Sequence, residues 1–233
     1  MNPIKGTEQR LIIALTGMTV VTGFIDAVSY VGLGHVFTAN MTGNVALLGF
    51  AVAGARQLSI ARSLLSLAAF LFGALIGGRI AMWMDTAHRR RWLTVGATEA
   101  GLLFLAAFAA IGYDANTEAP VSRLYAVIFL TALAMGLRTF SVRRLAVADI
   151  TTTVVTTLLA GLAGESSLAG GNNPRIWRRI ASVLAIFAGA YFGTRLLRFG
   201  LSVPLLLAGI ASFGVTIGYG ATMTVQESEA AAK

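Results

Sequence analysis

The chain has 233 residues, of which 56% are hydrophobic and only 12% charged, and this balance excludes an ordinary soluble domain. Its net charge of +8 comes from basic residues that lack the aromatic interleaving or finger-like spacing of nucleic-acid binders, so no nucleic-acid partner is expected. No cysteine and only two histidines are present, which excludes disulfides and a thiolate or histidine metal site. We therefore predict a multi-pass membrane protein that contacts the lipid bilayer and carries no metal and no cofactor.

Apolar stretches define the predicted helices in chain order. Six of them reach the length of about 20 residues that crosses roughly 30 Å of hydrocarbon, namely 11–34, 63–84, 92–112, 122–142, 180–198 and 201–223. Two others, 42–55 and 150–163, are shorter. No period-two alternation suggests a barrel, so helices must satisfy the backbone in lipid. The predicted fold class is an all-α membrane protein with about six transmembrane helices, forming a single membrane domain over 1–233 that ends in a polar tail at 224–233.

The basic residues decide between eight crossings and six. Eight crossings place nine of the 18 lysines and arginines on each side, whereas six crossings place thirteen inside and five outside. The positive-inside rule therefore favours six crossings with both termini in the cytoplasm. Each half then crosses an odd number of times, so the predicted repeats, 11–112 and 122–223, are inverted. Each repeat must also hold an additional half-length or re-entrant helix.

Motifs shared by the two halves support this duplication. Gly23–Asp26 precedes a polar segment at residues 39–45, and Gly136–Thr139 precedes a similar polar segment at 148–154. Each polar segment opens one of the short apolar stretches. Paired, polar-interrupted hydrophobic segments in two halves point to a central solute site in a transporter.

The two polar segments and Asp26 supply the candidate binding residues, which are Asp26, Asn40, Thr42, Asn44, Asp149, Thr151 and Thr152. Short oxygen-bearing side chains before a helix are typical caps of free backbone N–H groups, and capping alone would explain them. The functional alternative is that two helix N-termini converge on one cavity and hold an anionic or carbonyl group. Asp26 would bind a coupling proton or cation, or would accept backbone N–H bonds at a helix break. Arg138 lies near enough to Arg143 and Arg144 to reach the cytoplasmic surface.

Two further features are structural in this interpretation. Arg79 and Glu99 lie at similar depths in two antiparallel helices, so we expect a structural ion pair between them. Glycines spaced four apart, at Gly73 and Gly77 and again at Gly189 and Gly193, allow helices to approach closely. We expect packing within the chain rather than a homodimer seam, although the spacing fits both.

The motifs at Gly23–Ala27, Val36–Asn44 and Ala134–Leu137 resemble those of the YoaK-like family of bacterial integral membrane proteins of unknown function. The resemblance covers nearly the whole chain, and the segment Asn40–Asn44 is its most specific part. It implies a six-helix, multi-pass protein of the bacterial inner (plasma) membrane. It implies no substrate, and this chain departs from the family's usual amide residues at Arg138 and Thr139.

The leading functional prediction is a secondary transporter or channel for a small polar solute, bound between two inverted repeats and coupled to a proton or cation if Asp26 binds one. The alternative is a membrane scaffold or assembly factor that transports nothing and whose polar segments only cap helices. An enzyme is not expected, because no Ser-His-Asp or Cys-His set and no metal cluster can be assembled from these residues.

Overall fold

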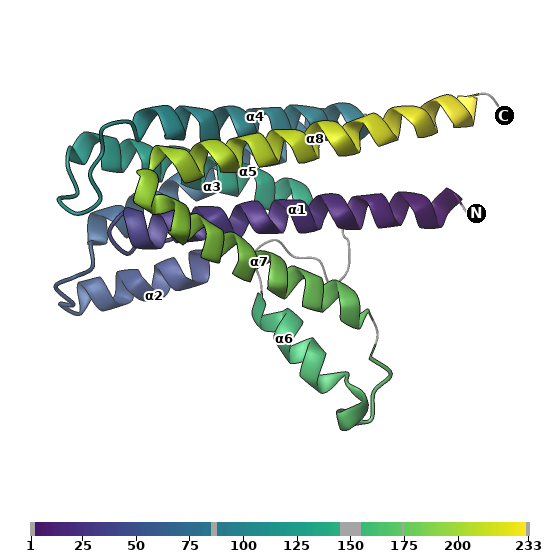
Figure 1. Cartoon of the computed structure of the whole chain (residues 1–233), viewed down its shortest axis with the longest axis horizontal. Coiled ribbons are helices and arrows are strands. Elements are labelled where there is room, and N and C mark those ends of the chain that lie inside the picture. The colour runs from purple at the N-terminus through teal and green to yellow at the C-terminus, as the bar shows by residue number, and fades with distance from the viewer. Residues whose placement is uncertain (1–2, 85–87, 145–154, 174, 232–233) are drawn as a thin grey trace.

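A computed structural model describes residues 3–84, 88–144, 155–173 and 175–231 as an assembly of helices (Figure 1). In chain order they are α1 (Pro3–Gly32), α2 (Met41–Val52), α3 (Ile60–Trp83), α4 (His88–Ala109), α5 (Val121–Arg143), α6 (Val155–Gly164), α7 (Ile176–Leu196) and α8 (Ser202–Ala231). Two 3₁₀ turns, η1 (Ser167–Ala169) and η2 (Leu197–Phe199), flank α7. Within these ranges the only pairing of β type is an isolated bridge between Asp114 and Ala119.

Six of these helices are long and apolar enough to cross a membrane, as the sequence predicted. Their spanning parts are 22 to 24 residues long, or about 33–36 Å at 1.5 Å per residue. Large apolar side chains point outward on them, including Phe108 at 74% exposure and Leu71 at 67%, which suits contact with lipid tails. The other two helices, α2 with 12 residues and α6 with 10, extend only about 18 and 15 Å.

The long helices pack in pairs. The helix α1 packs along α7, α3 along α5 and α4 along α8, while α4 also contacts α5 and α1 also contacts α8. The short helices lie outside these pairs, α2 against α3 and α6 against α7. In Figure 1, α2 and α6 lie on the side of α1 away from α4 and α8, and α1 begins at the same end of the molecule at which α8 ends.

Glycines allow two of these helix pairs to approach closely. A Cβ atom at Gly73 in α3 would lie 2.1 Å from the carbonyl oxygen of Leu133 in α5, and one at Gly136 would lie 2.0 Å from that of Phe70. Gly23 in α1 and Gly189 in α7 meet in the same way, since each faces a backbone carbonyl of the other helix. The repeated glycines therefore serve packing within the chain, as the sequence analysis expected.

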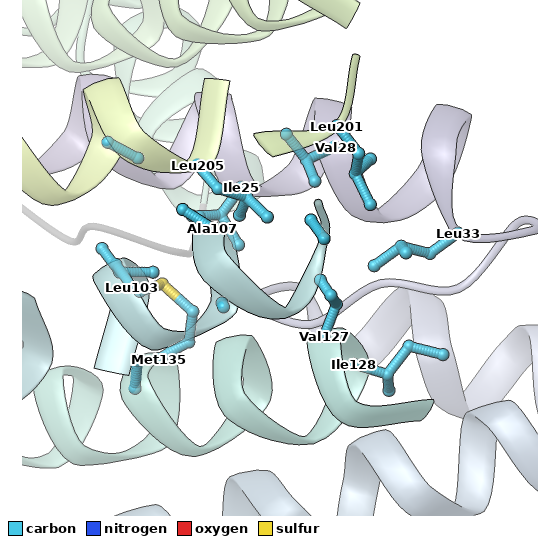
Figure 2. Close-up of a cluster of buried hydrophobic side chains, with 14 of the residues drawn as sticks. Ile25, Val28, Leu33, Leu103, Ala107, Val127, Ile128, Met135, Leu201 and Leu205 are labelled. Atoms are coloured by element: carbon cyan, nitrogen blue, oxygen red, sulfur yellow. The ribbon is translucent and has the colours of Figure 1, made fainter. Parts of the chain in front are cut away.

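The core lies where α1, α4, α5 and α8 meet (Figure 2). Its fully buried side chains include Ile25 from α1, Leu103 from α4, Ile128 from α5 and Leu205 from α8. In lipid the exterior is as apolar as the interior, so this core is held by close packing rather than by removal from water. It fixes α1 against α4 and α5, and thereby positions the polar residues described next.

The connection between α1 and α2 turns back into the bundle. Ser66 in α3 donates a hydrogen bond to the carbonyl of Phe37 at 2.6 Å, and the backbone of Ala39 and Asn40 contacts Asp26. Asp26 lies six residues before Gly32, at which α1 ends, so the chain has returned about 9 Å along α1 before α2 begins. The helix α2 therefore starts beside α1 and part-way along it, rather than at its end.

Candidate functional site

A cavity of about 450 Å³ lies where α1, α2, α6 and α7 come together. The polar side chains that line it come from three of these helices and from the residue before α2; they are Thr22, Asp26, Asn40, Thr42 and Thr156. Ile186 of α7 and the small residues Ala39, Gly43 and Ala46 provide apolar wall. A volume of this size falls in the range of small-molecule pockets, in which a few polar groups orient a ligand on apolar walls.

Asp26 is the one charged residue among the described residues that line this cavity. Its carboxyl group interacts with the backbone N–H groups of Ala39 and Asn40, and at longer range with the guanidinium of Arg138. Within the described part of the chain, its buried Oδ1 atom has no hydrogen-bond partner. One part of the carboxyl group therefore faces the start of α2, while Oδ1 has no partner among the described residues, and both interpretations of Asp26 stay predictions.

Asn40 caps α2, as its sequence position predicted. Its Oδ1 atom accepts a hydrogen bond from the backbone N–H of Gly43 at 3.1 Å, and its carbonyl accepts one from that of Asn44. A cap of this kind stabilises a helix by about 1 kcal/mol. Asn40 and Thr42 also line the cavity, so capping and ligand contact are both open to this segment.

Asn44 lies elsewhere than expected. It is fully buried between α2 and α3, where its Nδ2 atom donates to the carbonyl of Ser63 at 3.4 Å. It is not among the described residues that line the cavity. The physical reason is helical geometry, because a residue two positions after Thr42 points to a different face of α2.

The other three candidates, Asp149, Thr151 and Thr152, lie outside the described residues. Val155 and Thr156, which follow them at the start of α6, line the same cavity as Asp26 and Asn40. The structure therefore brings the start of α6 to the cavity that the first polar segment lines.

A buried ion pair joins α4 and α5, and its partners differ from those the sequence predicted. The Oε1 atom of Glu99 lies 3.4 Å from Nη1 of Arg138 and accepts a hydrogen bond from Ser212 of α8 at 2.9 Å. Arg138 also donates to the carbonyl of Met18 in α1 at 2.9 Å. Both charged side chains are almost inaccessible, at 1% and 2% exposure.

The predicted pair between Arg79 and Glu99 is therefore wrong. Arg79 lies on the exposed surface of α3, and α4 packs far more extensively on α5 and α8 than on α3. The expectation that Arg138 reaches the cytoplasmic surface is also wrong. A rule that every acid deep in an apolar stretch needs a basic partner would have named Arg79 and Arg138 as the two choices, but only helix packing selects between them.

Comparison with known proteins places the chain in a family. A family model described as "Protein of unknown function (DUF1275)" matches residues 14–218. The chain belongs to this family. It is also 34% identical over 157 residues to the UPF0700 transmembrane protein YoaK of Bacillus subtilis (strain 168), a match that covers 66% of the chain and 66%, just under two thirds, of that relative. The YoaK-like resemblance is thereby confirmed, and no solved structure matches the chain.

In this member of the DUF1275 family, two ion pairs between a more buried arginine and a more exposed glutamate lie at helix ends. Arg62 at the start of α3 bonds both carboxylate oxygens of Glu118 and donates to the carbonyl of Gly34 at 3.2 Å. Arg179 near the start of α7 bonds Glu165 at 2.8 Å. The hydrogen bond from Arg62 lowers the pKa of Glu118 below its usual value, and burial raises the pKa of Tyr113 nearby to about 12. Over the described ranges, no three His, Asp or Glu side chains group closely enough to hold a metal ion.

Proposed function

We propose that this chain is a secondary transporter or channel of the bacterial inner membrane, and that the cavity beside Asp26 binds its small polar solute. One observation carries the proposal: residues at the starts of both short helices, Asn40 and Thr42 before and in α2 and Thr156 in α6, line one cavity with Asp26. Half-length helices whose N-termini meet at a cavity inside the membrane are a recurrent design for holding polar groups of a solute.

We further propose that the two halves are inverted repeats. Exchange of α1 to α4 for α5 to α8 turns the α1–α7 contact into the α5–α3 contact, and turns α2 on α3 into α6 on α7. The same exchange maps the close approach of Gly23 and Gly189 onto that of Gly136 and Gly73. Each of the main packing contacts has its counterpart, and this supports a twofold relation that runs through the α4–α8 pair.

A scaffold or assembly factor would need the polar residues only as caps. That role accounts for the bond from Gly43 to Asn40, but it leaves unexplained an acid that lines a cavity of about 450 Å³ and whose Oδ1 atom has no partner among the described residues. An unsatisfied buried polar atom costs about 1–3 kcal/mol. Its retention here favours a role in binding over a purely structural one.

Levels of small polar solutes should be compared inside cells with and without the protein. We expect a difference for a defined solute, and we expect Asn40→Leu and Thr42→Val to abolish it while folding is retained. Asn116→Leu is the matched control, because Asn116 lies in the exposed loop between α4 and α5 and bonds only local groups of Asp114. Identical solute profiles with and without the protein, or full activity of folded Asn40→Leu, would overturn the proposal.

Whether water or lipid fills the cavity can be measured separately, since the chain has no cysteine of its own. We expect cysteines at Ala46 and Thr156, in the cavity wall, to react with a small hydrophilic thiol reagent. A cysteine at Leu71, exposed on the outer surface of α3, should stay unreactive because lipid surrounds it. Equal, slow reaction at all three sites would favour a lipid-filled groove and a scaffold.

A further inference from the structure

Among the described residues, Asp26, Glu99 and Arg138 bring charged side chains from three different helices into the interior of the bundle. Asp26 of α1 borders the cavity, Glu99 of α4 is buried, and Arg138 of α5 pairs with Glu99 at 3.4 Å and is attracted by both carboxylates. We call these residues the three-charge cluster. If both acids were ionised, the cluster would hold two negative charges against one positive charge.

Within the described part of the chain, Arg138 is the cation that acts on both carboxylates. Arg91 and His88 border a gap of about 30 Å³ next to Glu99 and Arg138, but they lie 8 and 11 residues before Glu99, in the first turn of α4. That separation is about 12 and 16 Å along the helix, which brings them to the end of the span. Ser212 of α8 donates a neutral hydrogen bond to Glu99, and the N-terminus of α2 offers Asp26 about half a positive charge.

An uncompensated charge in a membrane interior costs several kcal/mol, and uptake of one proton removes it. Of the two acids, Glu99 has the closer guanidinium and a hydroxyl donor, so its carboxylate is the better stabilised. Asp26 lines the cavity, from which a proton can arrive and to which it can return, and its buried Oδ1 atom has no hydrogen-bond partner among the described residues. The proton therefore belongs on Asp26.

We propose that Asp26 binds one exchangeable proton from the cavity and that the Arg138–Glu99 pair sets how tightly this proton is held. In this proposal the proton is the coupling ion of the transporter. The coupling rests on the proposed function, whereas the proton site does not. Binding joins the proton to a carboxylate oxygen of Asp26, and release returns it to cavity water. When the proton leaves, the guanidinium of Arg138 attracts both carboxylates and stabilises them.

The proposal makes Glu99 a positioning residue that acts through Arg138. Removal of the charge of Glu99 leaves the whole field of Arg138 acting on Asp26, and so Asp26 should lose its proton more easily. A like charge that shares a buried site typically moves the titration of a carboxyl group by about one pH unit or more, and we expect a shift of this size in the titration of Asp26.

The test is infrared difference spectroscopy of the purified protein in lipid vesicles during a pH titration, which detects the C=O stretch of protonated carboxyl groups. The wild type should show one such band that Asp26→Asn removes. Glu99→Gln should keep the band but move its midpoint to lower pH by about one unit or more. Glu118→Gln, an acid in an exposed loop paired with Arg62, is the matched control and should leave the band and its midpoint unchanged.

A second variant guards against failure of Glu99→Gln to fold. The double change Glu99→Leu with Arg138→Leu removes both charges of the pair, so the proton of Asp26 should be held at least as tightly as in the wild type. Absence of a band that depends on Asp26, or a midpoint that is the same in all variants, would overturn the proposal. Neither measurement needs a solute, so a failed proton site and a failed solute assay are distinguishable.

Discussion

The close crossing of α3 and α5 gives a prediction whose size follows from the structure. A Cβ atom added at Gly136 would lie 2.0 Å from the carbonyl oxygen of Phe70 and 3.0 Å from the backbone nitrogen of Ala74. The first distance is roughly 1.5 Å shorter than a normal non-bonded contact. Both atoms belong to the backbone of α3, so neither can move away without moving the helix.

Gly136→Ala should therefore force the two helices apart. Overpacking of this kind costs about 1–3 kcal/mol, against a gain of about 1 kcal/mol in helix propensity. Because backbone must move, we place the cost at the upper end and expect a net loss of about 2 kcal/mol. Gly101→Ala and Gly214→Ala are the matched controls, since a Cβ atom at either site meets nothing within 4 Å; they should be neutral or stabilising by up to about 1 kcal/mol.

Thermal unfolding in one detergent, followed by circular dichroism, compares these variants. A chain of this size loses about 2–4 °C in Tm per kcal/mol, so Gly136→Ala should melt about 4–8 °C below the wild type and both controls at or above it. Gly23→Ala, in the α1–α7 crossing, should lose a similar amount, because its Cβ atom would lie 2.3 Å from the carbonyl oxygen of Ile186. Equal melting of Gly136→Ala and Gly214→Ala would refute the close helix crossing.

Removal of either member of the Glu99–Arg138 pair should destabilise the protein by a few kcal/mol, because the other charge stays buried, and the double leucine variant should recover much of that loss in the same melting assay. An impermeant thiol reagent should label a cysteine at Asn116 but not one at Ser167 in intact cells; the reverse pattern would place both termini outside. The hydrogen bond from Arg62 lowers the pKa of Glu118, so the contribution of this pair to stability is present above about pH 4.3 and is lost as the pH falls through the lower, folded value. Glu118→Gln should remove this loss of stability at acid pH, which is under about 1 kcal/mol because the pair is partly exposed.

Asp26 and Asn40 show how far sequence reasoning reached into the site. Asp26 was expected deep in a long apolar stretch and Asn40 at the start of a short one, and both line the cavity, because an intramembrane acid and a cap are local signals. Asn44 belongs to the same polar segment, but its side chain points to α3. The sequence of one short helix does not predict which neighbouring helix each of its faces will contact. The expected residues Asp149, Thr151 and Thr152 lie outside the described part of the chain, so their role stays a prediction.

The sequence by itself determined the membrane class, the six long helices and the two short ones. These follow from the length of each apolar stretch measured against the thickness of the bilayer, and that comparison needs no neighbour. Tertiary structure alone decided that Arg138, rather than Arg79, pairs with Glu99, and that α6 reaches the cavity of Asp26. The reason is that Arg79 and Arg138 both lie in apolar helices, and the sequence alone does not distinguish them as partners of Glu99. Only the packing of α4 on α5, which depends on contacts between residues distant along the chain, brings one guanidinium within reach of the buried acid.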